Sequence, residues 1–249
     1  MTKMSRILLV ANPKSGARSN KNILDLTISE FEKSNIEFTL MNTEYAGHAI
    51  NLVKNCNFNE YSSVCAVGGD GTLNEVLNGM LARADQSKVP IGLVPGGTGN
   101  SFMKTLGLLE PLEAILKIIN NKPRIIDLMK VSGSDGVYYS LNLVGWGMAT
   151  DISIVAEKLR FLGEQRYNIA SVIEIIRNKK RPATLIIDDV ETTNDFCFII
   201  ACNTKYVGKG MKMAPEAVID DGLLDLIVVK QNSRSTLLSV FLNYSMVSI

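Results

Sequence analysis

Four short apolar runs in the first half of the chain constrain its fold more than any other feature. They span residues 7–11, 36–41, 64–67 and 91–94, and segments with helical spacing lie between them. Short apolar runs that alternate with helices are typical of a parallel sheet with right-handed crossovers. In such a sheet, ligands bind beyond the carboxyl ends of the strands. We therefore expect an N-terminal α/β domain with a ligand site at that edge of the sheet.

The character of the chain changes after about residue 123. Further strand-like runs follow, and one charged stretch with helical spacing, residues 151–180, interrupts them. This pattern indicates a mostly antiparallel β layer. The sequence therefore predicts two domains, residues 1–123 and residues 124–249, with a hinge near Lys122 and Pro123. The expected strands of the second domain are residues 125–131, 138–144, 184–187, 196–202 and 223–229.

Composition argues against several classes of protein. The 26 basic and 25 acidic residues leave a net charge of +1, which provides no field that would attract nucleic acid. The single histidine, His48, speaks against a Ser–His–Asp triad and a His-rich zinc site. The 4 cysteines form no CxxC pair, which indicates buried free thiols in a reducing compartment. No apolar run approaches the roughly 20 residues that span a bilayer, so we expect a cytoplasmic protein that meets any lipid peripherally at a membrane surface.

The strongest chemical signal is the loop Gly68-Gly69-Asp70-Gly71-Thr72, which directly follows the third apolar run. Adjacent glycines let the backbone approach a ligand without an intervening Cβ, and their amides with the following helix N-terminus can seat a phosphate. A carboxylate among phosphates is unfavourable unless it serves a metal ion or a proton transfer. Asp70 is therefore a candidate general base or Mg²⁺ partner. A glycine turn with a helix-capping aspartate is the alternative.

The fourth apolar run ends in a second loop of the same kind, Pro95-Gly96-Gly97-Thr98-Gly99-Asn100. Two such loops on consecutive strands face one crevice. A GxxxxGK[ST] loop is absent, and so is a GxGxxG motif between a strand and a helix. The sequence therefore argues against ordinary P-loop ATPases and Rossmann dehydrogenases.

Together, the two loops resemble the paired signatures of the diacylglycerol kinase catalytic-domain family, which includes bacterial lipid kinases, sphingosine kinases and ceramide kinases. The resemblance extends over almost the whole chain. Residues 12–16 resemble the family's first nucleotide loop, and residues 43–49 its next conserved segment. Residues 210–215 and 220–226 resemble the signature of its β-rich domain.

This resemblance implies an α/β nucleotide-binding kinase domain followed by an antiparallel β-sandwich, with ATP between the two domains. It implies ATP and Mg²⁺ as cofactors, a lipid at a membrane surface as the partner, and direct in-line transfer of the γ-phosphoryl group to a lipid hydroxyl. Asp70 would accept the hydroxyl proton or organise Mg²⁺, and Glu75 would steady the loop at residues 97–99. The residues expected at the nucleotide are Asn12, Pro13, Lys14, Thr43, Gly68, Gly69, Gly71, Thr72, Glu75, Gly97, Thr98, Gly99, Arg160 and Arg166.

Residues 145–151 and 157–167 are most similar to the sphingosine and ceramide kinases. In sphingosine kinases two arginines of this stretch meet the nucleotide phosphates, and they correspond to Arg160 and Arg166. Two guanidinium groups could clamp oxyanions in this way. Without the resemblance, a solvated helix face would explain the same arginines.

The expected substrate contacts are Asp151 and Ser153. Sphingosine kinases carry two acidic residues here, and the second contacts the substrate head group. Asp151 keeps the first acid, whereas Ser153 replaces the second and cannot pair with a sphingoid ammonium. The resemblance therefore leaves neutral alcohols of the ceramide or diacylglycerol type open.

The chain ends at Ile249 in an apolar run that resembles the helix before the family's last strands and late acidic motif. We expect a C-terminally truncated chain, which would be a fragment, a truncated gene product or a divergent member. A pseudokinase that binds nucleotide or lipid without turnover is one rival function, and an NAD kinase, which shares the first loop, is another. Trp146 lies between two glycines and would line a lipid cleft or belong to the core.

Overall fold

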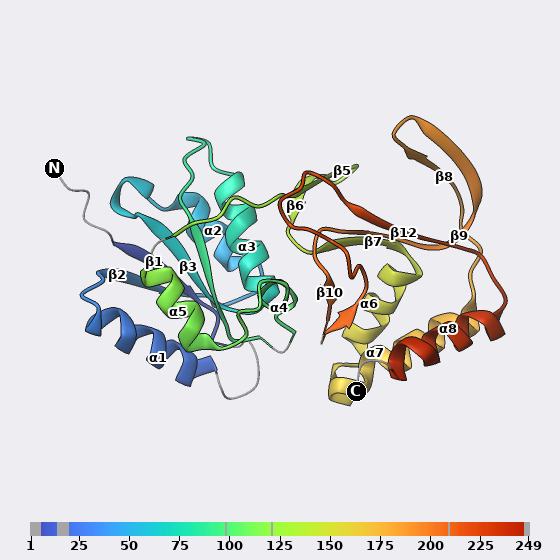
Figure 1. Cartoon of the computed structure of the whole chain (residues 1–249), viewed down its shortest axis with the longest axis horizontal. Coiled ribbons are helices and arrows are strands. Elements are labelled where there is room, and N and C mark those ends of the chain that lie inside the picture. Colours follow the sequence, from blue (N-terminus) through green and yellow to red (C-terminus); the bar gives the residue numbers. More distant parts are fainter. Residues whose placement is uncertain (1–5, 14–19, 98, 121, 209, 247–249) are drawn as a thin grey trace. The chain divides into compact units, whose positions relative to one another are not determined.

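The computed structural model describes residues 6–13, 20–97, 99–120, 122–208 and 210–246. The chain forms two compact units (Figure 1). It enters unit 2 at Leu143 and returns twice to unit 1. Unit 1 comprises Met1–Asn142, Thr204–Lys212 and Val218–Gly222, and unit 2 comprises Leu143–Asn203, Met213–Ala217 and Leu223–Ile249.

Unit 1 contains the expected parallel sheet, in the order β2-β1-β3-β4. Its strands are β1 (Ile7–Ala11), β2 (Phe38–Asn42), β3 (Ser63–Gly68) and β4 (Ile91–Pro95). Its helices are α1 (Asn20–Lys33), α2 (His48–Asn55), α3 (Asp70–Leu81), α4 (Ser101–Thr105) and α5 (Pro111–Ile119), with a short 3-10 turn η1 (Phe58–Glu60). The strand order reverses direction between β1 and β3, which is the topological switch point where α/β sheets bind ligands.

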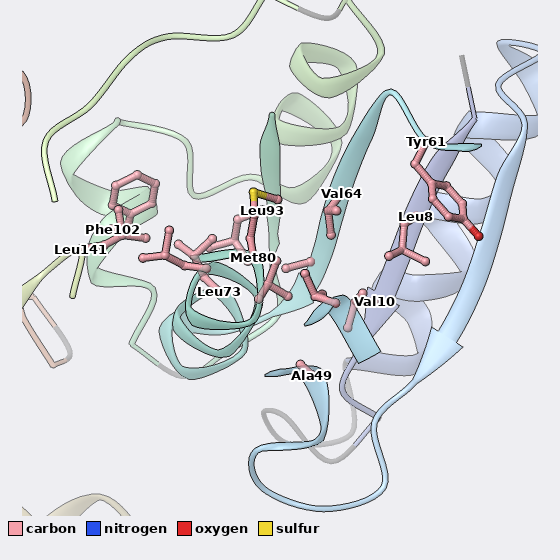
Figure 2. Packing of buried hydrophobic residues seen from close by; sticks show 14 of the residues in the cluster. Leu8, Val10, Ala49, Tyr61, Val64, Leu73, Met80, Leu93, Phe102 and Leu141 are labelled. Atoms are coloured by element: carbon pink, nitrogen blue, oxygen red, sulfur yellow. The ribbon is translucent and has the colours of Figure 1, made fainter. Parts of the chain in front are cut away.

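Both faces of this sheet are buried, which explains the near-continuous apolar runs of its strands. On one face, Leu8 and Val10 of β1 pack with α2 and α3, as Figure 2 shows for Ala49 and Leu73. On the other face, Leu9 packs with residues of α1 and α5. Burial raises the pKa of Cys65 in β3 to about 12, so this thiol is an inert core residue as the sequence predicts.

A buried arginine holds the end of α2 against the chain that follows α3. The Arg83 side chain is 6% exposed, and its guanidinium forms a two-pronged hydrogen bond with Asp85 at 2.9 and 2.6 Å. The Phe58 ring lies 4.0 Å from the guanidinium carbon. The guanidinium also donates to the backbone carbonyls of Val53, Lys54 and Cys56 at 2.8, 3.2 and 2.6 Å. These carbonyls are the acceptors that a helix end leaves without intrahelical partners.

Arg83→Lys should lower the free energy of unfolding by about 1–3 kcal/mol, because lysine keeps the charge but lacks the planar fork. Urea unfolding measures this loss. The exposed pair of Arg124 and Asp220 provides the control, since Arg124→Lys should change stability by less than about 0.5 kcal/mol. Equal losses in the two variants would contradict the assignment.

The same pair predicts a pH dependence. Hydrogen bonds from Arg83 lower the pKa of Asp85 to about 2, below the value of about 3.9 expected in an unfolded chain. The ionised carboxylate therefore stabilises the fold above about pH 4, and this contribution is lost as the pH falls towards 2. In Arg83→Lys this acid-dependent loss should be smaller.

A hairpin extends unit 1 beyond the boundary expected near residue 123. It consists of β5 (Met129–Gly133) and β6 (Gly136–Ser140). The Asn78 side chain of α3 accepts from the Tyr139 N–H and donates to the Tyr139 carbonyl, both at 2.9 Å. This link helps to explain why unit 1 extends to Asn142 rather than ending near residue 123.

Two strands that we expected, at residues 125–131 and 138–144, differ from those in the structure. Residues 125–128 do not join a strand, because the chain here bonds instead to the returning segment Val218–Gly222. Arg124 forms an ion pair with Asp220 at 2.6 Å, and the Asp127 N–H donates to the Ile219 carbonyl at 2.8 Å. The expected strand at residues 138–144 is divided between β6 and β7.

Unit 2 contains the antiparallel sheet that the sequence predicts, in the order β12-β9-β7, with β8 on the first half of β9. Its described residues include two buried clusters: Met148, Cys197 and Leu237 belong to the one with the helices, and Ile200 packs with Ala214 in the other. The strands are β7 (Leu143–Gly147), β8 (Pro182–Ile187), β9 (Val190–Cys202) and β12 (Asp225–Lys230). The helices are α6 (Met148–Lys158), the 3-10 segment η2 (Arg160–Gln165), α7 (Arg166–Arg177) and α8 (Arg234–Met246).

Trp146 is not a core residue of unit 2. It pairs with Ile199 across β7 and β9, and its side chain is 42% exposed. In the described part of the chain, none of the helices combines the length and apolar character that a bilayer-spanning segment needs.

Candidate active site

The carboxyl ends of the four parallel strands form one row of backbone hydrogen bonds. The Thr43 N–H donates to the Ala11 carbonyl at 2.8 Å, and the Asn12 N–H donates to the Val67 carbonyl at 3.1 Å. The row continues from the Gly96 N–H to the Gly68 carbonyl at 2.7 Å. The structure thus brings Asn12, Thr43 and both glycine loops to one edge of unit 1, as the sequence predicts.

The two glycine loops pack backbone against backbone. A Cβ on Gly97 would lie 2.5 Å from the Gly69 Cα, so only glycine fits there. The Asn100 side chain closes the second loop, because it accepts from the Gly97 N–H at 3.1 Å and donates to the Gly97 carbonyl at 2.9 Å. The protein therefore fixes the shape of this loop by its own contacts.

Asp70 is held by the start of the next helix. Its two carboxylate oxygens accept from the N–H groups of Ser101 and Phe102, at 2.7 and 3.0 Å. Asp70 is thus a helix-capping aspartate, but it caps α4 rather than its own helix α3. Each carboxylate oxygen accepts one of these hydrogen bonds and keeps a further lone pair. The carboxylate is fixed in orientation and is half-buried, so it can still accept a proton or bind a cation.

Open space lies beside Asp70 at Gly71. Gly71 is exposed, and no atom lies within 4 Å of the position that a Cβ would take. Thr72 is buried, and its Oγ1 accepts a long hydrogen bond of 3.5 Å from Asn12 Nδ2. Open space therefore lies beside the first turn of α3 at Gly71, which carries no side chain.

We expected Glu75 to steady the loop at residues 97–99, but among the described residues its carboxylate bonds to the start of another helix. Its carboxylate accepts from the Gly47 and Ala49 N–H groups, at 2.9 and 3.2 Å, at the start of α2. One turn of helix separates Glu75 from Thr72, but the side chain points toward α2 and caps that helix. Beside it, the His48 ring stacks on Tyr45 with centroids 4.5 Å apart.

Other expected site residues lie in unit 2 or outside the described residues. Asp151 Oδ2 accepts from Arg181 Nη2 at 2.6 Å and lies 3.4 Å from Lys179 Nζ. The Ser153 hydroxyl donates to the Ala149 carbonyl of its own helix at 3.1 Å.

Arg166 lies 3.7 Å from Glu157, and its guanidinium lies 5.0 Å from the Tyr167 ring. Arg160 begins η2, but its side chain is outside the description, as are Lys14 and Thr98. Pro13 is exposed next to Asn12.

The contacts that hold Asp70 cannot be predicted from the local sequence. Ser101 and Phe102 supply backbone amides, which any residue type could provide. The Ser101 hydroxyl donates at 3.0 Å to the carbonyl of Gly208, which is 107 positions away in the chain. No spacing pattern in the local sequence predicts such a pair. The segments Thr204–Lys212 and Val218–Gly222 belong to unit 1, although we assigned their motifs to the β-rich domain.

In the part of the chain that the structure describes, no three histidine, cysteine, aspartate or glutamate side chains gather where they could hold a metal ion. Mg²⁺ in phosphoryl-transfer sites usually needs only one or two protein carboxylates, because waters and substrate phosphates complete its shell. The fixed carboxylate of Asp70 fits that requirement.

The model of the diacylglycerol kinase catalytic domain matches residues 6–131, which include every loop at this edge. The chain belongs to the diacylglycerol kinase catalytic-domain family. Residues 142–245 match a second model, the YegS C-terminal NAD kinase beta sandwich-like domain. The boundary between the two matched family models thus falls close to Leu143, where the chain enters unit 2.

Relatives in this family include both diacylglycerol and sphingosine kinases. The chain is 31% identical to the diacylglycerol kinase of Bacillus subtilis, and the match covers 95% of the chain and 78% of that protein. It is 29% identical to sphingosine kinase 1 of Arabidopsis thaliana over 96% of the chain. The chain spans about three fifths of the plant enzymes, namely 60% of sphingosine kinase 1 and 59% of sphingosine kinase 2.

Solved structures share the fold. A diacylglycerol kinase from Bacillus anthracis matches with a TM-score of 0.75 and 23% identity, over 98% of this chain and 79% of that one. Another structure from the same organism matches with a TM-score of 0.78 and 25% identity, over 100% of this chain and 82% of the other. Both likenesses agree with an α/β unit followed by a β-rich unit.

Proposed function

We propose that this chain is an ATP-dependent lipid kinase that transfers the γ-phosphoryl group to a hydroxyl of a lipid at a membrane surface. The observation that carries the proposal is the fixed carboxylate of Asp70 beside two interlocked glycine loops at the carboxyl edge of the parallel sheet. Membership of the diacylglycerol kinase catalytic-domain family supports it.

In the proposed reaction, the lipid hydroxyl oxygen forms a bond to the γ-phosphorus while the bond from that phosphorus to the β–γ bridging oxygen breaks. ADP leaves with the bridging oxygen, and the hydroxyl proton passes to Asp70. Mg²⁺ on the nucleotide phosphates would supply charge neutralisation, and organising this ion is the alternative role of Asp70. The protein contributes position: Asp70 is oriented by two amide donors before any ligand arrives.

The nucleotide would meet the glycine loops through backbone amides. The open space at Gly71 and the first turn of α3 supports a phosphate there. Asn12 and Thr43 lie on the neighbouring strand ends, and we propose that they border the nucleotide. Arg160 and Arg166 are proposed to neutralise its phosphates, a role in which Arg166 would leave its long contact of 3.7 Å with Glu157.

For the acceptor, we propose a neutral lipid alcohol rather than a sphingoid base. A sphingoid ammonium needs a free carboxylate nearby, but Arg181 and Lys179 already pair with Asp151. Burial by itself raises the pKa of Asp151, but the hydrogen bond from Arg181 and the charge of Lys179 outweigh it and hold that pKa below its ordinary value. Ser153 offers only a hydroxyl, which already donates within α6.

Ser153→Asp should shift acceptor choice toward sphingosine, because it adds a second carboxylate beside the already paired Asp151. The expected gain is one charge-assisted hydrogen bond, about 1.5–3 kcal/mol, or roughly 12- to 160-fold in the ratio of kcat/KM values. Competition between sphingosine and dioctanoylglycerol measures this ratio, with Ser153→Asn as the uncharged control. A parent enzyme that already prefers sphingosine strongly would contradict the proposal of a neutral acceptor.

The function itself is tested with [γ-³²P]ATP and a panel of acceptors in mixed micelles: diacylglycerol, ceramide and sphingosine, with NAD in solution. We expect labelled lipid phosphate with one or more of the lipids and none with NAD. Label in NAD would identify an NAD kinase. Binding of ATP without any labelled product would identify a pseudokinase.

A further inference from the structure

The hairpin of β10 (Tyr206–Val207) and β11 (Met211–Lys212) lies against the helix that holds Asp70. The Ser101 hydroxyl donates to the Gly208 carbonyl at 3.0 Å, in the turn of this hairpin. The Lys104 ammonium lies 4.8 Å from the centre of the Tyr206 ring. All of these residues belong to unit 1, although the segment Leu143–Asn203 of unit 2 lies between α4 and the hairpin in the sequence.

Ser101 has two separate tasks in this arrangement. It is 4% exposed, so both of its polar groups need partners inside the protein. Its N–H donates to Asp70 Oδ2 at 2.7 Å, and its hydroxyl donates to Gly208. One residue therefore joins the carboxylate to the hairpin.

The hairpin also lies close to Gly99 of the second glycine loop. A Cβ there would lie 2.9 Å from the Gly208 carbonyl oxygen and 3.8 Å from Asp70 Oδ2. The Gly208 carbonyl thus sits over the second glycine loop, between the loop and Ser101. A shift of the hairpin would move the start of α4 and, with it, the two amides that orient Asp70.

We infer that Ser101 is a positioning residue, through which the β10–β11 hairpin sets the orientation of the Asp70 carboxylate. The inference rests on the proposed function, in which Asp70 takes the hydroxyl proton. Ser101 touches no reacting atom. Its hydroxyl is needed only to hold α4 where its amides meet the carboxylate.

Ser101→Ala removes the hydroxyl and keeps the amide. We expect kcat to fall about 2- to 12-fold, the rate equivalent of one lost hydrogen bond, with the KM for ATP unchanged. Ser101→Thr should restore kcat, because it retains the hydroxyl. Thr105→Ala is the matched control, since the Thr105 hydroxyl donates only to the Ser101 carbonyl within α4, at 3.1 Å.

The decisive arm combines Ser101→Ala with Asp70→Asn, using dioctanoylglycerol in mixed micelles as the acceptor. If Ser101 acts through Asp70, adding Ser101→Ala to Asp70→Asn should lower the residual rate of Asp70→Asn no further. An additive effect, or an equal loss of kcat in Thr105→Ala, would overturn the inference. If Asp70→Asn alone leaves the rate unchanged, the proposed role of Asp70 fails, and if the parent phosphorylates no lipid, the proposed function fails instead.

Amide hydrogen exchange tests the link without any turnover. In Ser101→Ala, the Phe102 amide should exchange faster than in the parent, while the amides in the middle of α3 should not change. An unchanged Phe102 amide would overturn the inference even if the enzyme slowed.

Discussion

Asp70→Asn should lower the turnover number about 10²- to 10⁴-fold, the loss typical of a removed general base. The substitution is nearly isosteric, but the amide cannot take the lipid hydroxyl proton. Its NH₂ group would also face one of the two N–H donors of α4, so stability should fall by about 1 kcal/mol for one lost hydrogen bond. Steady-state kinetics and thermal unfolding separate the two effects.

Asp25→Asn, an exposed aspartate of α1, provides the matched control and should leave the rate unchanged. Titration with Mg²⁺ distinguishes the two roles of Asp70. A lost proton acceptor leaves the Mg²⁺ requirement as it was, whereas a lost Mg²⁺ partner raises it. A rate within a few-fold of the parent would remove Asp70 from the mechanism.

Gly97→Val should weaken ATP binding by more than tenfold, because the two glycine loops would have to separate. A Cβ at this position would lie 2.5 Å from the Gly69 Cα and 2.9 Å from Asn100 Oδ1. Backbone atoms cannot yield as a flexible side chain can, so we also expect a stability loss of about 1–3 kcal/mol from overpacking. Calorimetric titration with ATP measures the affinity, and circular dichroism verifies that the variant is folded.

Gly71→Ala is the informative counterpart in the neighbouring loop. No atom lies within 4 Å of the added methyl group, so stability should stay within about 0.5 kcal/mol of the parent. Affinity for ATP should nevertheless fall, because the methyl group enters the space proposed for a phosphate. Unchanged affinity in both glycine variants would show that the loops are turns with no ligand role.

Much of the fold follows from local patterns in the sequence. The strands of unit 1 carry short apolar runs because both faces of the sheet are buried, and this made β1 and β3 easy to predict. The antiparallel layer of unit 2 was predicted from a series of strand-like runs with one helical stretch among them. The start of the second unit was harder to predict, since the hairpin β5–β6 joins unit 1 through the Asn78 side chain and through packing of Tyr139 on its core.

Those residues of the candidate site that lie together in one loop could be predicted from the sequence. Contacts between segments that are far apart in the chain could not. The glycines and Asp70 could be recognised in the sequence, because adjacent glycines that free the backbone and a charged carboxylate seldom occur together in a loop for structural reasons alone. The bonds from Glu75 to the start of α2 were not predicted, because helical spacing gives the face of a residue but not which neighbour it caps. Ser101 was missed because its partner, Gly208, enters the site through a backbone carbonyl from far along the chain.

One measurement tests the central claim most directly. A single turnover of [γ-³²P]ATP with excess enzyme and dioctanoylglycerol should yield one labelled lipid phosphate for each ADP released, and Asp70→Asn should lose both products together. Release of ADP with inorganic phosphate but no labelled lipid, or undiminished lipid labelling by Asp70→Asn, would contradict direct phosphoryl transfer at this site.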